Sequence, residues 1–203
     1  GLHLMLIPFL ETDITNPMVM FEGMLASEIP NLVITVNLDF LRICSVDSEF
    51  YSVCKSNEYN LIDGFGIKYL LQLKYRKRFE VFTGNDVFRY LLEFGNYKKL
   101  SIAVVGADQN TLDIVSEKIK NKFTDLNLAL IESPPMYFEQ DSELNLQIIE
   151  KLINSHPDIL VIALGCPRQE KWLFNNMVNI GAKINVGVGA ALEFYAGTKK
   201  RAP

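Results

Sequence analysis

Short apolar runs alternate with longer amphipathic stretches along the chain, and this alternation restricts the fold more than any other feature of the sequence. We expect strands at 32–36, 101–105, 126–131, 159–164 and 184–188, and another short apolar run ends at 61–62. We expect helices at 18–26, 45–54, 67–73, 87–94, 111–123, 143–154 and 167–177, and a short helix through Tyr195. Asn16-Pro17 and Asn85-Asp86 are expected to begin two of these helices. The alternation predicts an α/β fold, namely one doubly wound domain with a mainly parallel sheet.

The composition excludes several classes of function. The chain has 203 residues, of which 49% are hydrophobic, and this suits one domain with a substantial core. Its formal net charge of −4 argues against a nucleic-acid partner, because such partners attract basic surfaces. Three cysteines and two histidines are too few and too scattered for a disulfide framework, a zinc site or a catalytic triad, and the odd cysteine count suits a reducing cytoplasm. No apolar run has the length of about 20 residues that a membrane span needs, so we expect a soluble or at most peripheral protein.

The segment Pro157–Trp172, PDILVIALGCPRQEKW, predicts a ligand site. An apolar run at 159–164 ends at Gly165, and Pro167 then stands where a proline favours the start of a helix. The polar residues that follow therefore lie at the carboxyl end of a buried strand, which is where open α/β sheets bind ligands. Arg168, Gln169 and Glu170 are therefore candidates for contact with a ligand, and Arg168 and Glu170 are otherwise part of a solvated first turn.

Three other strand ends carry polar or glycine residues that packing does not require. They are Thr35-Val36-Asn37, Asp63-Gly64-Phe65-Gly66 and Gly106-Ala107-Asp108. In a parallel sheet, all of these ends would meet at one edge and could surround one ligand. Asp63 stands at a strand tip, where a partly desolvated carboxylate can accept a proton from a hydroxyl. From local sequence alone, an ordinary turn aspartate before glycine is an equally good interpretation.

Other local features leave alternatives open. Gly187-x-Gly189 follows a strand, as in dinucleotide-binding loops, but the third glycine is missing and little chain follows, which disfavours a nicotinamide enzyme. Tyr137-Phe138 follows two prolines and predicts either a mobile loop over a site or a surface hairpin. Basic residues cluster at 74–78 and 199–201. Each cluster is either a solvated helix end or tail, or a contact for an anionic ligand or a membrane surface.

Taken together, these motifs resemble one known family. Thr35-x-Asn37, Asp63-Gly64-x-Gly66, Thr83-Gly84-x-Asp86, ALGCPRQEKW and VGVGAALEFYAGTKKRAP occur in the order and spacing of the WecG/TagA/CpsF glycosyltransferases. The resemblance covers nearly the whole chain. It implies a Rossmann-like domain that binds a UDP-sugar and transfers N-acetylmannosamine or a related sugar, with inversion, to a polyprenyl-diphosphate-linked saccharide. The products would be teichoic-acid linkage units, common antigen or capsular polysaccharide.

The resemblance also implies roles for individual residues. Asp63 resembles the general base that deprotonates the acceptor hydroxyl, and Thr35 and Asn37 resemble the pair beside it. Gln169 corresponds to a polar contact in the pocket, and Glu193 stands where the family commonly has an aspartate that contacts the nucleoside. The remaining candidates for substrate binding are Gly106, Tyr137 and Arg201.

We expect no cofactor and no metal ion, because the sequence contains no Asp-x-Asp segment. Backbone N–H groups, helix N-termini and basic side chains would then balance the charge of UDP.

The chain departs from the family pattern at Val81, where the family usually has an arginine, at Glu193, and after Pro203, where family members usually continue. We therefore expect a single glycosyltransferase domain at 1–203 that lacks a C-terminal membrane-associating appendage. It would be a cytoplasmic protein, peripheral at the inner face of the cell membrane, with contact to that membrane made mainly through the appendage. A non-catalytic UDP-sugar-binding or scaffold subunit is the main alternative, a nucleotide-dependent oxidoreductase is a weaker one, and a homo-oligomer stays open.

Overall fold

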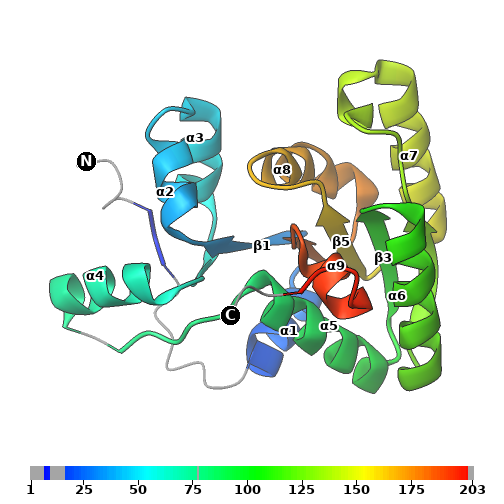
Figure 1. Cartoon of the computed structure of the whole chain (residues 1–203), viewed down its shortest axis with the longest axis horizontal. Helices are drawn as coiled ribbons and strands as arrows, with labels where there is room; N and C mark the ends of the chain where they lie inside the picture. The colour runs from blue at the N-terminus through cyan, green and yellow to red at the C-terminus, as the bar shows by residue number, and fades with distance from the viewer. Residues whose placement is uncertain (1–6, 10–16, 77, 201–203) are drawn as a thin grey trace.

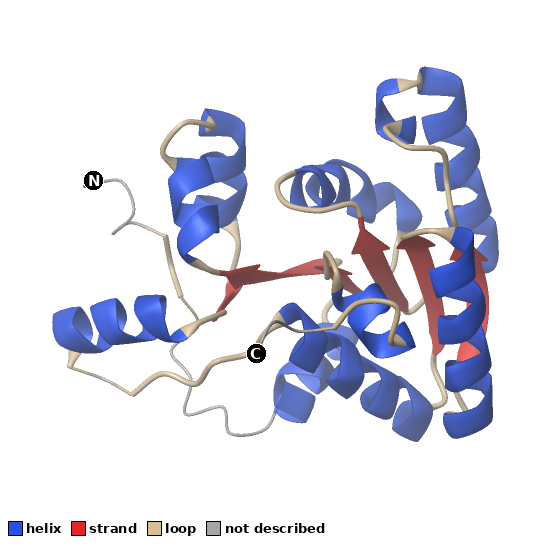
Figure 2. Ribbon diagram, viewed as in Figure 1, coloured by secondary structure: helices blue, strands red, loops and turns tan. Residues whose placement is uncertain are grey.

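The computed structural model describes residues 7–9, 17–76 and 78–200, and within them the chain folds around one six-stranded sheet (Figure 2). Every pair of neighbouring strands is parallel, in the order β2-β1-β6-β5-β3-β4. The α/β class and the parallel sheet expected from the sequence are thereby confirmed. The strands are β1 (Asn31–Val36), β2 (Tyr59–Ile62), β3 (Ser101–Gly106), β4 (Asn127–Glu132), β5 (Ile159–Ala163) and β6 (Ile184–Gly187).

Helices cover both faces of the sheet (Figure 1). None of the described helices is long and apolar enough to cross a bilayer. The helices are α1 (Pro17–Ala26), α2 (Leu38–Cys44), α3 (Ser48–Ser56), α4 (Phe65–Tyr75), α5 (Gly84–Lys98), α6 (Gln109–Lys122), α7 (Ser142–Ser155), α8 (Arg168–Ile180) and α9 (Ala191–Ala196), with a 3-10 turn at Phe138–Gln140.

Two hydrophobic clusters, one on each face, form the core. Helices α2, α3, α4, α7 and α8 contribute to the cluster on what we call the first face. Helices α1, α5, α6 and α9 contribute to the cluster on the second face. This distribution follows from right-handed crossovers, because connections that run in opposite directions along the sheet place their helices on opposite faces. Strands β3 and β5 are neighbours in the sheet, but the chain leaves their ends toward opposite faces. Between two such strands lies a topological switch point, where a crevice opens.

The register brings the polar strand ends to one edge, as expected. Thr35 pairs with Leu61, and Gly106 pairs with Ala163. The register of the strands between them places both pairs at the same height along the sheet. The backbone N–H of Asp63 continues the ladder and donates to the carbonyl of Val36 over 2.8 Å. The ends of β1, β2, β3, β5 and β6 therefore point the same way.

Two expectations about helices need correction. The sequence predicted one helix at 45–54, but the structure has α2 before it, and α3 begins only after the cap at Asp47. Asn37 accounts for α2, since its side chain accepts a hydrogen bond from the N–H of Phe40 over 3.0 Å. The cap of α5 is Thr83, not Asn85-Asp86. Asp86 is the third residue of the helix and completes a capping box with Thr83.

Candidate functional site

Thr35, Asn37 and Asp63 lie together at the carboxyl ends of β1 and β2. Thr35 is buried, whereas Asn37 and Asp63 are half-buried at the edge of the sheet. Because Val33 and Leu61 pack in the second-face cluster, strand alternation also directs Thr35 toward the second face. The structure therefore brings the predicted base next to the pair expected beside it. Asn37 has a second task here, since its side-chain oxygen caps α2.

Gln169 is a buried clamp between the ends of β5 and β6. Its side-chain oxygen accepts hydrogen bonds from the N–H groups of Gly165, at 3.2 Å, and Gly189, at 3.0 Å. A Cβ atom at Gly187 would lie only 2.5 Å from Cγ of Gln169, so the strand leaves room for this side chain only with glycine at that position. Gly187 therefore has a structural role at the end of β6, and this role accounts for the first glycine of the Gly-x-Gly pair without a ligand.

Glu170 contradicts its expected place in a solvated turn. The residue is only 1% exposed in the first turn of α8. One carboxylate oxygen accepts a hydrogen bond from the side-chain amide of Gln169 over 2.9 Å, and the other is buried without a hydrogen-bond partner among the described residues. Burial raises the pKa of the Glu170 carboxyl to about 7. Burial and the nearby Glu170 also raise the pKa of the Cys166 thiol.

Arg168 also differs from the expected solvated residue, because it forms an ion pair with the loop that follows β4. Its guanidinium donates two hydrogen bonds to the carboxylate of Glu139, at 2.6 and 3.0 Å. This pairing lowers the pKa of Glu139. The same guanidinium lies over the ring of Tyr137, 4.3 Å from its centroid. Phe138 next to it is buried against Trp172, so this segment is neither a surface hairpin nor a loop without anchor points.

Gly106 ends β3 beside the switch point, and Tyr137 lies in the loop that follows the neighbouring strand β4. A Cβ atom at Gly106 would meet the carbonyl oxygen of Ala163 at 2.3 Å, and the φ angle of 118° also favours glycine there. After β4, the hydroxyl of Ser133 donates to the carbonyl of Ala107 over 2.7 Å. This bond ties the loop that carries Tyr137 to the end of β3. Tyr137, half of whose surface is exposed, therefore lies at the edge where ligands are expected.

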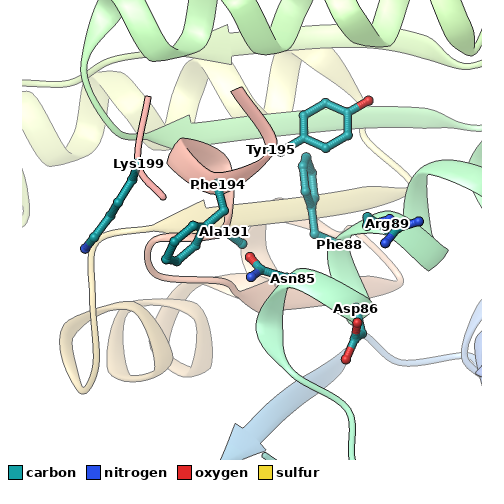
Figure 3. Close-up of a pocket in the computed structure, with 8 residues that line it drawn as sticks. All are labelled: Asn85, Asp86, Phe88, Arg89, Ala191, Phe194, Tyr195 and Lys199. Atoms are coloured by element: carbon teal, nitrogen blue, oxygen red, sulfur yellow. The ribbon is translucent and has the colours of Figure 1, made fainter. Parts of the chain in front are cut away.

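A cavity of about 410 Å³ opens between α5 and α9 on the second face (Figure 3). Figure 3 shows side chains of α9 and Lys199 on one side of it and polar side chains of α5 on the other. It is joined to the strand ends, because the N–H of Phe82 donates to the carbonyl of Ile62, and Gly84 packs against the carbonyl of Val188. The lining residues are Asn85, Asp86, Phe88, Arg89, Ala191, Phe194, Tyr195 and Lys199.

Sequence reasoning missed this cavity, although Thr83-Gly84-x-Asp86 begins one of its walls. Of its cations, Arg89 was not singled out from the sequence, whereas Lys199 belongs to the basic cluster at 199–201, for which an anionic ligand was one of two interpretations. Arg89 lies one helical turn beyond Asp86 on α5. The signal that could have located it is the cap at Thr83, because a helix that begins there places both side chains on the same face.

Glu193 lies on α9, but it is not among the residues that line the cavity. On a helix, residues 191, 194 and 195 share one side, and residue 193 faces away from them. One carboxylate oxygen of Glu193 is buried and has no hydrogen-bond partner among the described residues. Arg201, the remaining predicted contact, lies outside the described residues.

Val81, where an arginine was expected, forms a parallel bridge with Ile62, the residue before Asp63. The side chain at this position is therefore close to the end of β2. Arg78, three residues earlier, is exposed.

Comparisons with known proteins agree with these motifs. A family model described as "Glycosyl transferase WecG/TagA/CpsF family" matches residues 3–203. Three relatives carry the name N-acetylglucosaminyldiphosphoundecaprenol N-acetyl-beta-D-mannosaminyltransferase. The one from Bacillus subtilis (strain 168) is 26% identical over 97% of this chain and 75% of its own length. Those from Bacillus spizizenii (strain ATCC 23059 / NRRL B-14472 / W23) and Staphylococcus aureus (strain MRSA252) are 25% and 22% identical over 84% of this chain. The chain spans 64% and 65% of the length of these last two.

Proposed function

Because the chain belongs to the WecG/TagA/CpsF family of glycosyl transferases, we propose that it moves N-acetylmannosamine or a related sugar from UDP to a polyprenyl-diphosphate-linked saccharide. The names of the relatives, which specify a mannosaminyl donor group and a diphosphoundecaprenol-linked acceptor, support this choice of substrates. The site would work at the inner face of the cell membrane, in the synthesis of a cell-surface polysaccharide.

The observation that carries the proposal is the position of Asp63 beside Asn37 and Thr35 at the carboxyl edge of the sheet. In the proposed reaction, the carboxylate of Asp63 takes the proton from the acceptor hydroxyl. The freed oxygen attacks the anomeric carbon, the bond from that carbon to the UDP oxygen breaks, and UDP leaves from the opposite side. One base and a stabilised diphosphate suffice for such an inverting displacement.

We propose that the donor nucleoside binds on the side of α9 that carries Glu193. The buried and unpartnered oxygen of Glu193 supports this assignment, because a buried acceptor without a donor is costly unless a ligand supplies one. The cavity between α5 and α9 lies on the other side of that helix, so we assign it to the acceptor. Arg89 and Lys199 would then face the diphosphate of the acceptor, and the aromatic rings would pack against its sugars.

The central test compares Asp63→Asn with the unmodified chain in transfer from UDP-N-acetylmannosamine to a lipid-linked acceptor. We expect a loss of turnover of at least about a hundredfold, because general-base catalysis contributes about that much, and an unchanged affinity for UDP by calorimetry. Asn121→Asp, at an exposed position at the far end of α6, is a matched control that should change neither quantity. Unchanged turnover in Asp63→Asn would remove Asp63 as the base.

The same measurements separate the proposal from a non-catalytic UDP-sugar-binding subunit, which Val81 beside the end of β2 would favour. That alternative predicts UDP binding without transfer, even when donor and acceptor are saturating. Val81→Arg would restore the family residue and should then raise the transfer rate. A chain that binds UDP but shows no transfer with either residue at this position would favour the binding subunit.

The assignment of the cavity is tested with Arg89→Gln. We expect the KM for the acceptor to rise by about tenfold, as the loss of one charge-assisted hydrogen bond implies, while the affinity for UDP stays the same. Lys120→Gln, at an exposed position on α6, serves as the control. A weaker affinity for UDP would instead assign the cavity to the donor.

A further inference from the structure

Helix α4 presents an apolar surface that no other described part of the chain covers. Ile67 and Leu71 hold the helix to the first-face core, but the next apolar stripe, at 65, 69 and 73, turns outward. Leu73 is 79% exposed and Phe65 68% exposed. Figure 1 shows α4 at the left-hand end of the molecule, away from the middle of the sheet. We call the following residues the α4 patch: Leu38, Phe65, Tyr69, Leu70 and Leu73.

The patch is continuous across two helices. Gly66 lacks a side chain where Leu38 of α2 approaches, since a Cβ atom there would lie 2.8 Å from Cδ1 of Leu38. Leu38 is therefore seated on α4 while 55% of its surface stays exposed. An exposed apolar surface built from two elements is more than a scattered set of hydrophobic residues, and such surfaces mark interaction sites.

Positive charge gathers at the C-terminal end of the α4 patch. Residues 64–79 contain five basic residues and no acidic one, whereas the whole chain has a formal charge of −4. Lys74, Arg76 and Arg78 are exposed at the end of the helix and just beyond it. Asp39, the acidic neighbour of Leu38, is paired with Arg42 at 2.8 Å. Apolar and aromatic residues on one side of a helix, with lysine and arginine beside them, are typical of helices that lie in the interface of an anionic bilayer.

We propose that the α4 patch is the surface by which this protein docks on anionic lipid. The partly exposed rings of Tyr69 and Tyr75 suit the headgroup region, where amphipathic aromatic side chains gather. The long basic side chains can reach phosphate groups while their stems lie along the apolar surface. A second copy of the chain fits less well, because a two-fold contact would bring the basic residues of both copies together.

The α4 patch also lies close to the proposed catalytic residues. This part of the argument rests on the proposed function, in which the acceptor is anchored in the bilayer. Helix α4 begins two residues after Asp63, and α2 begins directly after Asn37. A polyprenyl-linked acceptor keeps its tail in the bilayer while its sugar reaches the base. Docking through α2 and α4 would hold that membrane next to the strand ends that carry both residues.

The test is cosedimentation of the chain with vesicles of phosphatidylcholine alone or mixed with phosphatidylglycerol. We expect binding to the mixed vesicles only, and we expect the double variant Tyr69→Ser, Leu73→Ser to bind them at least about tenfold more weakly. The variant Lys74→Glu, Arg78→Glu should also bind at least about tenfold more weakly, because an anionic surface attracts basic residues and repels acidic ones. Val178→Ser and Lys120→Glu, at exposed positions on α8 and α6, should bind like the unmodified chain.

Affinity for UDP and far-UV circular dichroism, measured on every variant, show whether the fold is kept. Unchanged vesicle binding by both patch variants would overturn the inference. So would a chain that ignores vesicles but sediments as a dimer that the patch variants dissociate, since the patch would then bind a second copy. Vesicle binding needs no sugar transfer, so failure of the transferase proposal with intact patch-dependent binding would leave this inference standing.

Discussion

At the scale of single residues, three neighbours in the first turn of α8 have three different environments, because successive helix positions turn by about 100°. Arg168 pairs with Glu139, Gln169 clamps two strand ends, and Glu170 is buried. The direction of the sheet beneath a helix is a tertiary property, and no local pattern contains it.

The burial of Glu170 predicts an unusual dependence of stability on pH. Its folded-state pKa of about 7 lies above the ordinary value for glutamate, so the folded chain binds more protons than the unfolded chain between pH of about 4.5 and 7. This residue therefore makes the free energy of unfolding fall as pH rises through that window. Glu170→Gln should remove this contribution, so that the variant gains stability relative to the unmodified chain by up to about 3 kcal/mol at pH 8 compared with pH 4.

Urea unfolding at several pH values measures this difference. Glu117→Gln, at an exposed position on α6, is the control and should follow the unmodified chain. A stability difference between Glu170→Gln and the unmodified chain that does not change with pH would contradict this prediction. The carboxyl of Glu170 would then have the same pKa in the folded and the unfolded chain.

Gly187 and Gln169 predict a rescue experiment. Gly187→Ala should cost about 1–3 kcal/mol of unfolding free energy, because its Cβ atom would press on the side chain of Gln169. The same substitution in a Gln169→Ala background should cost clearly less. Gly106→Ala is the matched control, since its Cβ atom would meet a backbone carbonyl that Gln169→Ala does not move. Equal costs in both backgrounds would show that Gly187 is needed for another reason.

At the scale of elements, regular segments followed the sequence and irregular ones did not. The strand at 101–105 and the helix at 111–123 were predicted within a few residues, because their periodicity is strong. Helix α2 was missed, since its seven residues are too few for a period to show and its cap, Asn37, already had a functional interpretation. The loop after β4 was left undecided, because its contacts are with a helix about 30 residues later, at Arg168.

The pair Arg168–Glu139 should hold that loop measurably. A double-mutant cycle with Arg168→Ala and Glu139→Gln is expected to give a coupling energy of about 1 kcal/mol at pH 7, because the bonds are paired and partly buried. Since Arg168 lowers the pKa of Glu139, the coupling should be lost as pH falls through that lowered value. Lys151–Glu132, a more exposed pair on neighbouring elements, is the comparison and should couple less. No coupling at pH 7 would mean that Phe138 and Ser133 hold the loop without help from this ion pair.

At the scale of the whole molecule, the layered α/β architecture followed from the sequence because alternation constrains it directly. The strand order did not, since the sequence says which segments are strands but not which of them are neighbours. The cavity between α5 and α9 was missed for that reason, because its walls lie about 100 residues apart in the chain. The two core clusters share the strands of one sheet, so neither can form without the other.

This arrangement predicts a single cooperative unfolding transition. The sequence contains one tryptophan, Trp172, which is buried in the first-face cluster. Its fluorescence therefore reports on the unfolding of that face. Leu91→Ala on α5 lies in the second-face cluster and should cost about 2–5 kcal/mol. Fluorescence and circular dichroism should then shift together to the same lower urea midpoint. A fluorescence midpoint that does not move in Leu91→Ala would show that the two faces unfold separately.

The position of β6 has a consequence for how the chain is made. This strand follows the other five in the sequence, yet it lies between β1 and β5 in the middle of the sheet. During synthesis, all residues of the other five strands emerge before residues 184–187, so until then β1 lacks the neighbour that joins it to β5. The candidate site takes residues from both sides of β6, so it cannot be completed before synthesis has passed this strand.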